Sequence, residues 1–127
     1  MSASILLVED NEQNRYLVTF LLENAGYRVL HAPDGHAAIE RATAERPDII
    51  LMDIQLPEMD GYETARRIRA SPGLENTPLV AVTSYAMPGD RERAIGLGFS
   101  GYIEKPIDTE TFVSSIAWHL GEKEART

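Results

Sequence analysis

A chain of 127 residues with 43% hydrophobic side chains is long enough for one domain with a buried core and too short for two ordinary domains. Its formal net charge of −8 argues against a surface that directly binds nucleic-acid phosphates or an anionic membrane. The lack of cysteine excludes disulfides, thiolate metal sites and a cysteine nucleophile, and it is compatible with a reducing cytosol.

Export and membrane signals are not found in the sequence. Met1–Ser4 leads directly into an apolar run, without the basic segment of a signal peptide. Apolar stretches such as Ile49–Met52 are far shorter than the roughly 20 residues that span a bilayer. We therefore expect a cytoplasmic protein without a membrane span. Residues 1–127 should form a single domain, with a core at about 4–121 and a frayed tail at Glu122–Thr127.

Five short apolar runs alternate with segments of helical period, which is typical of parallel strands joined by crossover helices. Ile5–Val8 predicts the first strand, and a helix from about Glu12 follows it. Gly26 stands where a left-handed residue commonly ends a helix. The inner side of this helix is predicted to consist of Leu17, Phe20, Leu21 and Asn24.

The middle of the chain repeats this order. Tyr27–His31 predicts the second strand, and the turn at Pro33–Gly35 leads into a helix that ends before Pro47. Ile49–Met52 is apolar throughout, which suits a central strand covered on both faces. After a loop, the pattern predicts a helix at about Gly61–Ala70.

The last part of the chain supplies two more strands, Leu79–Val82 and Tyr102–Glu104. Between them, a helix with Pro88 in its first turn is expected to be the weakest and the one that moves, because it is rich in glycine. Its charged run Asp90–Arg93 indicates a solvated face. Asp108 can cap a final helix. That helix carries apolar side chains at a spacing of four, at Phe112, Ile116 and Leu120.

Polar residues follow four of the five predicted strands. The carboxyl ends of parallel strands share one edge of the sheet, where ligands bind in open α/β folds. The residues at these ends are Glu9 and Asp10, Asp53, Thr83 and Ser84, and Lys105 with Pro106. Each of these residue types is also common as a simple cap, so the prediction depends on their joint placement. We expect three acids, two hydroxyls and an ammonium group to converge.

Carboxylates placed this close repel one another and need a compensating charge. Mg²⁺ prefers oxygen ligands and keeps several of its waters, which fits this set. The ion would bring a phosphoryl donor to Asp53, whose carboxylate would act as the nucleophile. Thr83 and Lys105 would hold the remaining phosphoryl oxygens.

Several motifs resemble the receiver family of two-component signalling. They are Leu6–Asn11, Leu51–Pro57 with Asp60–Gly61, Val82–Ser84 and Tyr102–Ile107. The resemblance covers about Ser4–Gly121 and is greatest to single-domain response regulators of the DivK type. It implies a flavodoxin-like (βα)5 fold, with a doubly wound parallel sheet of five strands in the order 2-1-3-4-5. It also implies a phosphoprotein that switches its partner surface and is not an enzyme, apart from assisting its own phosphorylation and dephosphorylation.

The same resemblance assigns roles to residues at the strand ends. Asp53 would be the phosphoacceptor. The magnesium ligands would be Asp10, Asp53 and the backbone carbonyl of Gln55, with Glu9 acting through water. Lys105 would pair with Asp53 and the phosphate. The family more often has Asp at position 9, and the extra methylene of Glu9 still permits a water-mediated contact.

Further implied features concern switching. The bond before Pro106 would be cis, Thr83 would move toward the phosphate, and Tyr102 would turn inward. The face formed by the fourth helix, fifth strand and fifth helix would then read out the state to a downstream protein. The phosphoryl donor would be a sensor histidine kinase or a histidine phosphotransferase. We also expect Tyr85 and Gln55 to restrict the attacking water and prolong the phosphorylated state.

Two other functions share parts of this pattern. A receiver-like interaction module could keep the fold and signal without phosphate, although every expected site residue is present here. An aspartyl-phosphate hydrolase of the haloacid-dehalogenase type also uses a carboxylate nucleophile and Mg²⁺. That type needs a second acid two residues after the nucleophile, where this chain has Gln55, and there is little room for a substrate-selecting cap.

Overall fold

The computed structural model describes residues 3–56, 59–84 and 87–121, in which strands and helices alternate. The strands are β1 (Ser4–Val8), β2 (Arg28–Ala32), β3 (Ile49–Asp53), β4 (Leu79–Thr83) and β5 (Gly101–Glu104). The helices are α1 (Glu12–Asn24), α2 (Gly35–Glu45), α3 (Gly61–Arg69), α4 (Asp90–Gly96) and α5 (Phe112–His119). None of these helices has the length and apolar character needed to cross a membrane.

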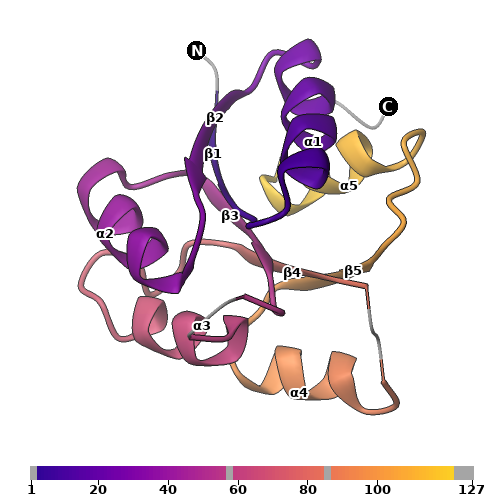
Figure 1. Cartoon of the computed structure of the whole chain (residues 1–127). Coiled ribbons are helices and arrows are strands. Elements are labelled where there is room, and N and C mark those ends of the chain that lie inside the picture. Colours follow the sequence, from indigo (N-terminus) through magenta and orange to yellow (C-terminus); the bar gives the residue numbers. More distant parts are fainter. Residues whose placement is uncertain (1–2, 57–58, 85–86, 122–127) are drawn as a thin grey trace.

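The strands form one parallel sheet in the order β2-β1-β3-β4-β5. Figure 1 shows α1 and α5 on one face of this sheet and α2, α3 and α4 on the other. The predicted flavodoxin-like, doubly wound α/β fold is therefore confirmed. The connection changes direction between β1 and β3, which places the switch point of the sheet at the ends of these two strands.

The central strand β3 is buried along its whole length. Its side chains alternate between the two faces: Ile49 and Leu51 pack with residues of α1 and α5, whereas Ile50 and Met52 pack with residues of α2, α3 and α4. Burying each such side chain contributes roughly 1.5–3 kcal/mol. The strand is thus a firm base for Asp53, its last residue.

The buried side of helix α1 only partly matches the prediction: Leu21 packs against the core as predicted, but the centre of the buried stripe lies elsewhere. Val18 and Leu22 are its buried residues, while Leu17 and Phe20 are 40% and 57% exposed. Neighbouring positions on a helix are about 100° apart, so the prediction placed the inner stripe one position too early. The hydroxyl of Thr19 lies 2.9 Å from Nε2 of His31 on β2, and this polar contact at the edge of the sheet fits the observed rotation.

Two predicted helix starts are also wrong. Helix α4 begins two residues after Pro88, because Gly89 is its N-cap and has a φ of 89°. Asp108 does not cap α5; its carboxylate accepts the backbone N–H of Glu110 (3.0 Å) and so caps the turn before that helix. The predicted tail lies outside the described residues, and β2 begins one residue later than expected.

Candidate functional site

The carboxyl ends of three strands bring two acids and an ammonium group together. Asp53 ends β3, Glu9 follows β1, and Lys105 follows β5. Nζ of Lys105 donates to Oε1 of Glu9 at 2.9 Å and to Oδ2 of Asp53 at 3.0 Å. The side chains of all three residues are at most 10% exposed, so these ion pairs are largely shielded from water. We call Glu9, Asp10, Asp53 and Lys105 the acidic rim.

Backbone groups orient the two buried carboxylates. The N–H of Gln55 donates to Oδ1 of Asp53 at 2.8 Å, so each oxygen of Asp53 accepts one hydrogen bond. The N–H of Asn11 donates to Oε2 of Glu9 at 3.2 Å, and the side chain of Asn11 caps α1. Sequence reasoning gave Asn11 no role. Its signal was available, because Asn directly before a helix is a preferred N-cap.

The loop after β3 is held by a close backbone approach. Gly61 donates its N–H to the carbonyl of Ile54 at 3.0 Å, and a Cβ added to Gly61 would lie 2.5 Å from Cα of Ile54. Only glycine fits this contact without displacement of the backbone. Asp60 caps α3 by accepting the N–H of Glu63 at 2.9 Å. The two residues fix the loop that carries Gln55.

Burial and ion pairing shift the pKa values of Glu9 and Lys105 in opposite directions. Burial raises the pKa of Glu9, and the nearby Asp53 adds to this, while Lys105 partly offsets it. Burial alone would lower the pKa of Lys105, but its hydrogen bonds to Glu9 and Asp53 outweigh this and raise that pKa. Lys105 therefore stays charged and compensates part of the excess negative charge.

Carboxylate oxygens of Glu9, Asp10 and Asp53 lie within 4.8 Å of one another. Glu9 and Asp53 are buried, whereas Asp10 is exposed and opens the cluster to solvent. Three carboxylates with a single ammonium group leave net negative charge, and hard oxygen donors are the ligands that Mg²⁺ prefers. The donor set therefore fits a magnesium ion. The expected convergence of the three acids and Lys105 is confirmed.

The remaining expected residues lie on or directly after the strands β4 and β5. Thr83 ends β4 and is fully buried, and the bond between Lys105 and Pro106 is cis, as the resemblance implies. Tyr102 on β5 is only 8% exposed, so its ring already points inward. Tyr85 lies outside the described residues.

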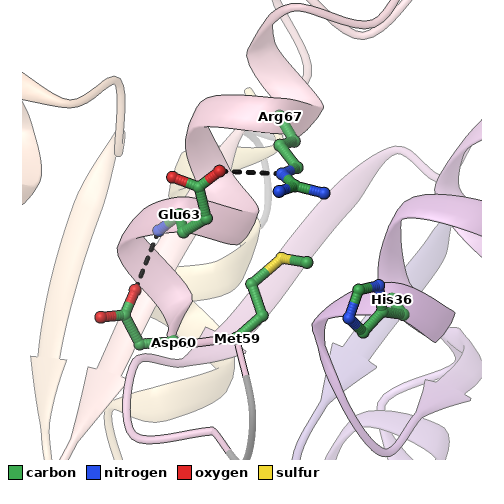
Figure 2. A pocket seen from close by; sticks show the side chains of 5 residues that line it. All are labelled: His36, Met59, Asp60, Glu63 and Arg67. Atoms are coloured by element: carbon green, nitrogen blue, oxygen red, sulfur yellow. Dashed lines mark hydrogen bonds and ion pairs between the residues drawn. The ribbon is translucent and has the colours of Figure 1, made fainter.

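A polar pocket of about 400 Å³ lies between α2 and α3. Figure 2 shows the side chains that line it: His36, Met59, Asp60, Glu63 and Arg67. Its charged groups already have partners, because Glu63 pairs with Arg66 and Arg67, which hold the pKa of Glu63 at about 2. No residue of the acidic rim lines this pocket. It offers no free donor set comparable with that of the rim.

Comparison with known proteins agrees with this geometry. Residues 5–117 match the family model of the response regulator receiver domain. Over 122 residues the chain is 42% identical to the polar-differentiation response regulator DivK of Brucella anthropi, with 96% of this chain and 99% of that protein covered. The corresponding protein of Brucella ovis is 41% identical over the same length and coverage.

Solved structures give the same result. The receiver domain of a sensor histidine kinase from Pseudomonas aeruginosa, which has a magnesium ion in its active-site cleft, is 37% identical, with a TM-score of 0.88 over 95% of this chain and 99% of that chain. The chemotaxis protein CheY4 of Vibrio cholerae is 30% identical, with a TM-score of 0.88 over 93% of this chain and 98% of that chain. The chain thus belongs to the response regulator receiver family of two-component signalling, and it is similar to regulators of single-domain, DivK-like type.

Proposed function

We propose that this chain accepts a phosphoryl group on Asp53 from a sensor histidine kinase or a histidine phosphotransferase and thereby switches its partner surface. One observation carries the proposal: Asp53 is a buried carboxylate at the end of the central strand, hydrogen-bonded by Lys105 beside two further acids. An oxygen of Asp53 would attack phosphorus, the O–P bond would replace the P–N bond of phosphohistidine, and the departing imidazole would take up a proton.

The residues that would hold Mg²⁺ are Asp10, Asp53 and the backbone carbonyl of Gln55, with Glu9 acting through water. The acidic cluster supports this assignment because its oxygens lie close together and carry excess negative charge. When bound, the ion would screen the charge that develops during phosphoryl transfer. Glu9 and Lys105 contact each other directly, so Glu9 also helps to keep the ammonium group at the rim.

Lys105 and Thr83 would hold phosphoryl oxygens after transfer. Lys105 is already 3.0 Å from Asp53, and Thr83 is buried at the end of the neighbouring strand. Movement of Thr83 toward the phosphate, beside a Tyr102 ring that already lies inward, would change the face formed by α4, β5 and α5, which would bind the downstream target. Gln55 and Tyr85 would tune how fast water removes the phosphoryl group.

The chain would act as one receiver unit in the cytoplasm. Its net charge of −8 supports contact with protein partners rather than nucleic acid or membrane surfaces. Its own chemistry would be limited to taking up and losing its phosphoryl group, without turnover of a separate substrate.

The test is incubation with Mg²⁺ and acetyl phosphate, followed by intact mass spectrometry. We expect a stable gain of one phosphoryl group, which disappears in Asp53→Asn and when Mg²⁺ is chelated. Asp48→Asn is a matched control, because Asp48 is exposed directly before the start of the same strand, away from Asp53, and should leave the gain unchanged. Turnover of a small phosphate ester would favour the hydrolase function. No gain with either acetyl phosphate or an active cognate kinase would favour the phosphate-independent module.

A further inference from the structure

Two buried tyrosine hydroxyls have no hydrogen-bond partner among the residues that the structure describes. They belong to Tyr62 on α3 and Tyr102 on β5. A buried hydroxyl without a partner loses its hydrogen bonds to water and gains none in return. The described conformation is therefore raised in free energy at these two oxygens, and a conformation that pairs them is favoured to that extent.

The same two rings hold helix α4. The guanidinium carbon of Arg93 lies 4.1 Å from the ring centroid of Tyr62, and that of Arg91 lies 5.5 Å from the ring centroid of Tyr102. Nη2 of Arg91 also donates to the backbone carbonyl of Tyr102 at 3.3 Å. The run Asp90–Arg93 was expected to be only a solvated face. Its two arginines are exposed, as expected, yet they connect α4 to the tyrosines.

Little else fixes α4 in place. It has seven residues, its N-cap Gly89 provides no side-chain hydrogen bond, and Ala94 is its one buried residue. Figure 1 shows α4 on the same face of the sheet as α3, which carries Tyr62. A helix of two turns that has no side-chain N-cap and buries a single residue can shift at low cost.

Asp90 is the first residue of α4, the helix whose two arginines contact the tyrosine rings. Its carboxylate accepts the backbone N–H of Met87 at 2.8 Å at the start of α4. Burial, and next to it the charge of Asp90, raise the pKa of Tyr62 and of Tyr102, and the pKa of Tyr102 is raised further by Tyr62 itself. The carboxylate of Asp90 thus acts electrostatically on both hydroxyls, from the same helix whose arginines contact the two rings.

We propose that Tyr62 is a positioning residue of the switch, whose ring holds α4 through Arg93 in the described state and whose hydroxyl donates to Asp90 after α4 shifts on phosphorylation. The inference rests on the function proposed above. In the shifted state, Asp90 exchanges its contact with the N–H of Met87 for a charge-assisted bond from the buried hydroxyl. The unpaired hydroxyl oxygen of Tyr62 raises the free energy of the described state, and this favours the change of hydrogen-bond partner.

The test compares amide hydrogen exchange in α4 before and after phosphorylation of Asp53 by acetyl phosphate with Mg²⁺. In the chain without substitutions, we expect phosphorylation to change the rate of amide exchange in α4 by about tenfold. This factor corresponds to the free energy of one charge-assisted hydrogen bond. Tyr62→Phe keeps the ring over Arg93 and removes only the hydroxyl, so this change should fall below about twofold. Tyr16→Phe is the matched control, because Tyr16 is 75% exposed and its hydroxyl is solvated.

Two further variants separate the ring from the hydroxyl. Arg93→Met should speed exchange in α4 by about fivefold without phosphate, because the contact with the Tyr62 ring is lost. Combining Tyr62→Phe with Asp90→Asn should have no larger effect than Tyr62→Phe alone, because Asn removes the charge from the same bond that Phe abolishes. A full response in Tyr62→Phe, or additive effects in the double variant, would overturn this inference alone. If intact mass spectrometry detects no phosphoryl group on the chain without substitutions, the proposed function itself is contradicted.

Discussion

The acidic rim and the tyrosine pair next to α4, Tyr62 and Tyr102, differ in how their buried polar atoms are paired. At the rim, Lys105 donates to Glu9 and Asp53, and the second oxygen of Asp53 accepts from Gln55. Under α4, the hydroxyls of Tyr62 and Tyr102 are buried without a partner among the described residues. A network in which the polar atoms are paired fixes one geometry, whereas unpaired buried atoms favour rearrangement.

This difference matches two different tasks. A carboxylate that receives a phosphoryl group has to be oriented before the donor arrives, since misplacement by about 1 Å costs rate. A surface that reports the phosphorylated state needs two conformations of similar free energy. With the proposed function, the sheet would combine a fixed acceptor with an adjustable neighbouring helix. Substitutions in the two regions should therefore have different consequences.

The largest effect is expected from Lys105→Met, which keeps the length of the side chain and removes its charge. Glu9 and Asp53 would then face each other in a buried site without their ammonium partner. We expect the free energy of unfolding to fall by about 2–4 kcal/mol in urea denaturation without Mg²⁺. Adding Mg²⁺ should restore part of the loss, because the ion binds the folded rim.

The control for that substitution is Arg67→Met, which removes a cation from the exposed ion pair with Glu63. Exposed pairs of this kind add little stability, because water screens them. Equal losses in the two variants, or no recovery of Lys105→Met with Mg²⁺, would contradict the view that the rim is a tightly coupled network.

A second, smaller effect is expected from Gly61→Ala. The added methyl group would lie 2.5 Å from Cα of Ile54 and would push the loop that carries Gln55. Overpacking of this kind costs about 1–3 kcal/mol of unfolding free energy. Because the loop also orients Asp53, calorimetry should show weaker magnesium binding. Normal magnesium affinity in a destabilised variant would show that the loop and the rim are not coupled.

The rim was predictable because sequence order alone places its residues. Asp53 and Lys105 follow apolar runs, and the ends of parallel strands meet at one edge whatever the details of packing. The direct contact of Lys105 with Glu9 was not predicted. It joins residues 96 positions apart and depends on the rotamers of two long side chains, about which the local pattern says nothing.

The region around the helices was less predictable. Apolar residues on α1 fit two adjacent stripes of the same period, and only the packed structure selects Val18 and Leu22 over Leu17 and Phe20. The role of Tyr62 was missed for a related reason. A tyrosine on the inner side of a helix indicates ordinary core, and its contact with Arg93 exists only because α3 and α4 lie together on the same face.

The smallest effect on stability is expected from Gly96→Ala, and its sign is opposite to that of Gly61→Ala. Gly96 is the last residue of α4, and a Cβ added there would meet nothing within 4 Å. Gly96→Ala should stabilise α4 by up to about 0.5–1 kcal/mol, because alanine loses less backbone entropy than glycine in a helix. Amide exchange in α4 should slow by a few fold while the rest of the sheet stays unchanged.

The same change, glycine to alanine, is thus expected to destabilise at Gly61 and to stabilise at Gly96. Close packing at the first position leaves no space for a methyl group, whereas at the second position the limiting factor is the intrinsic stability of a short helix. If Gly96→Ala also weakens the response of α4 to phosphorylation, the low stability of this helix is itself part of the switch. If exchange in α4 does not slow, its attachment through Arg91 and Arg93 limits its motion instead.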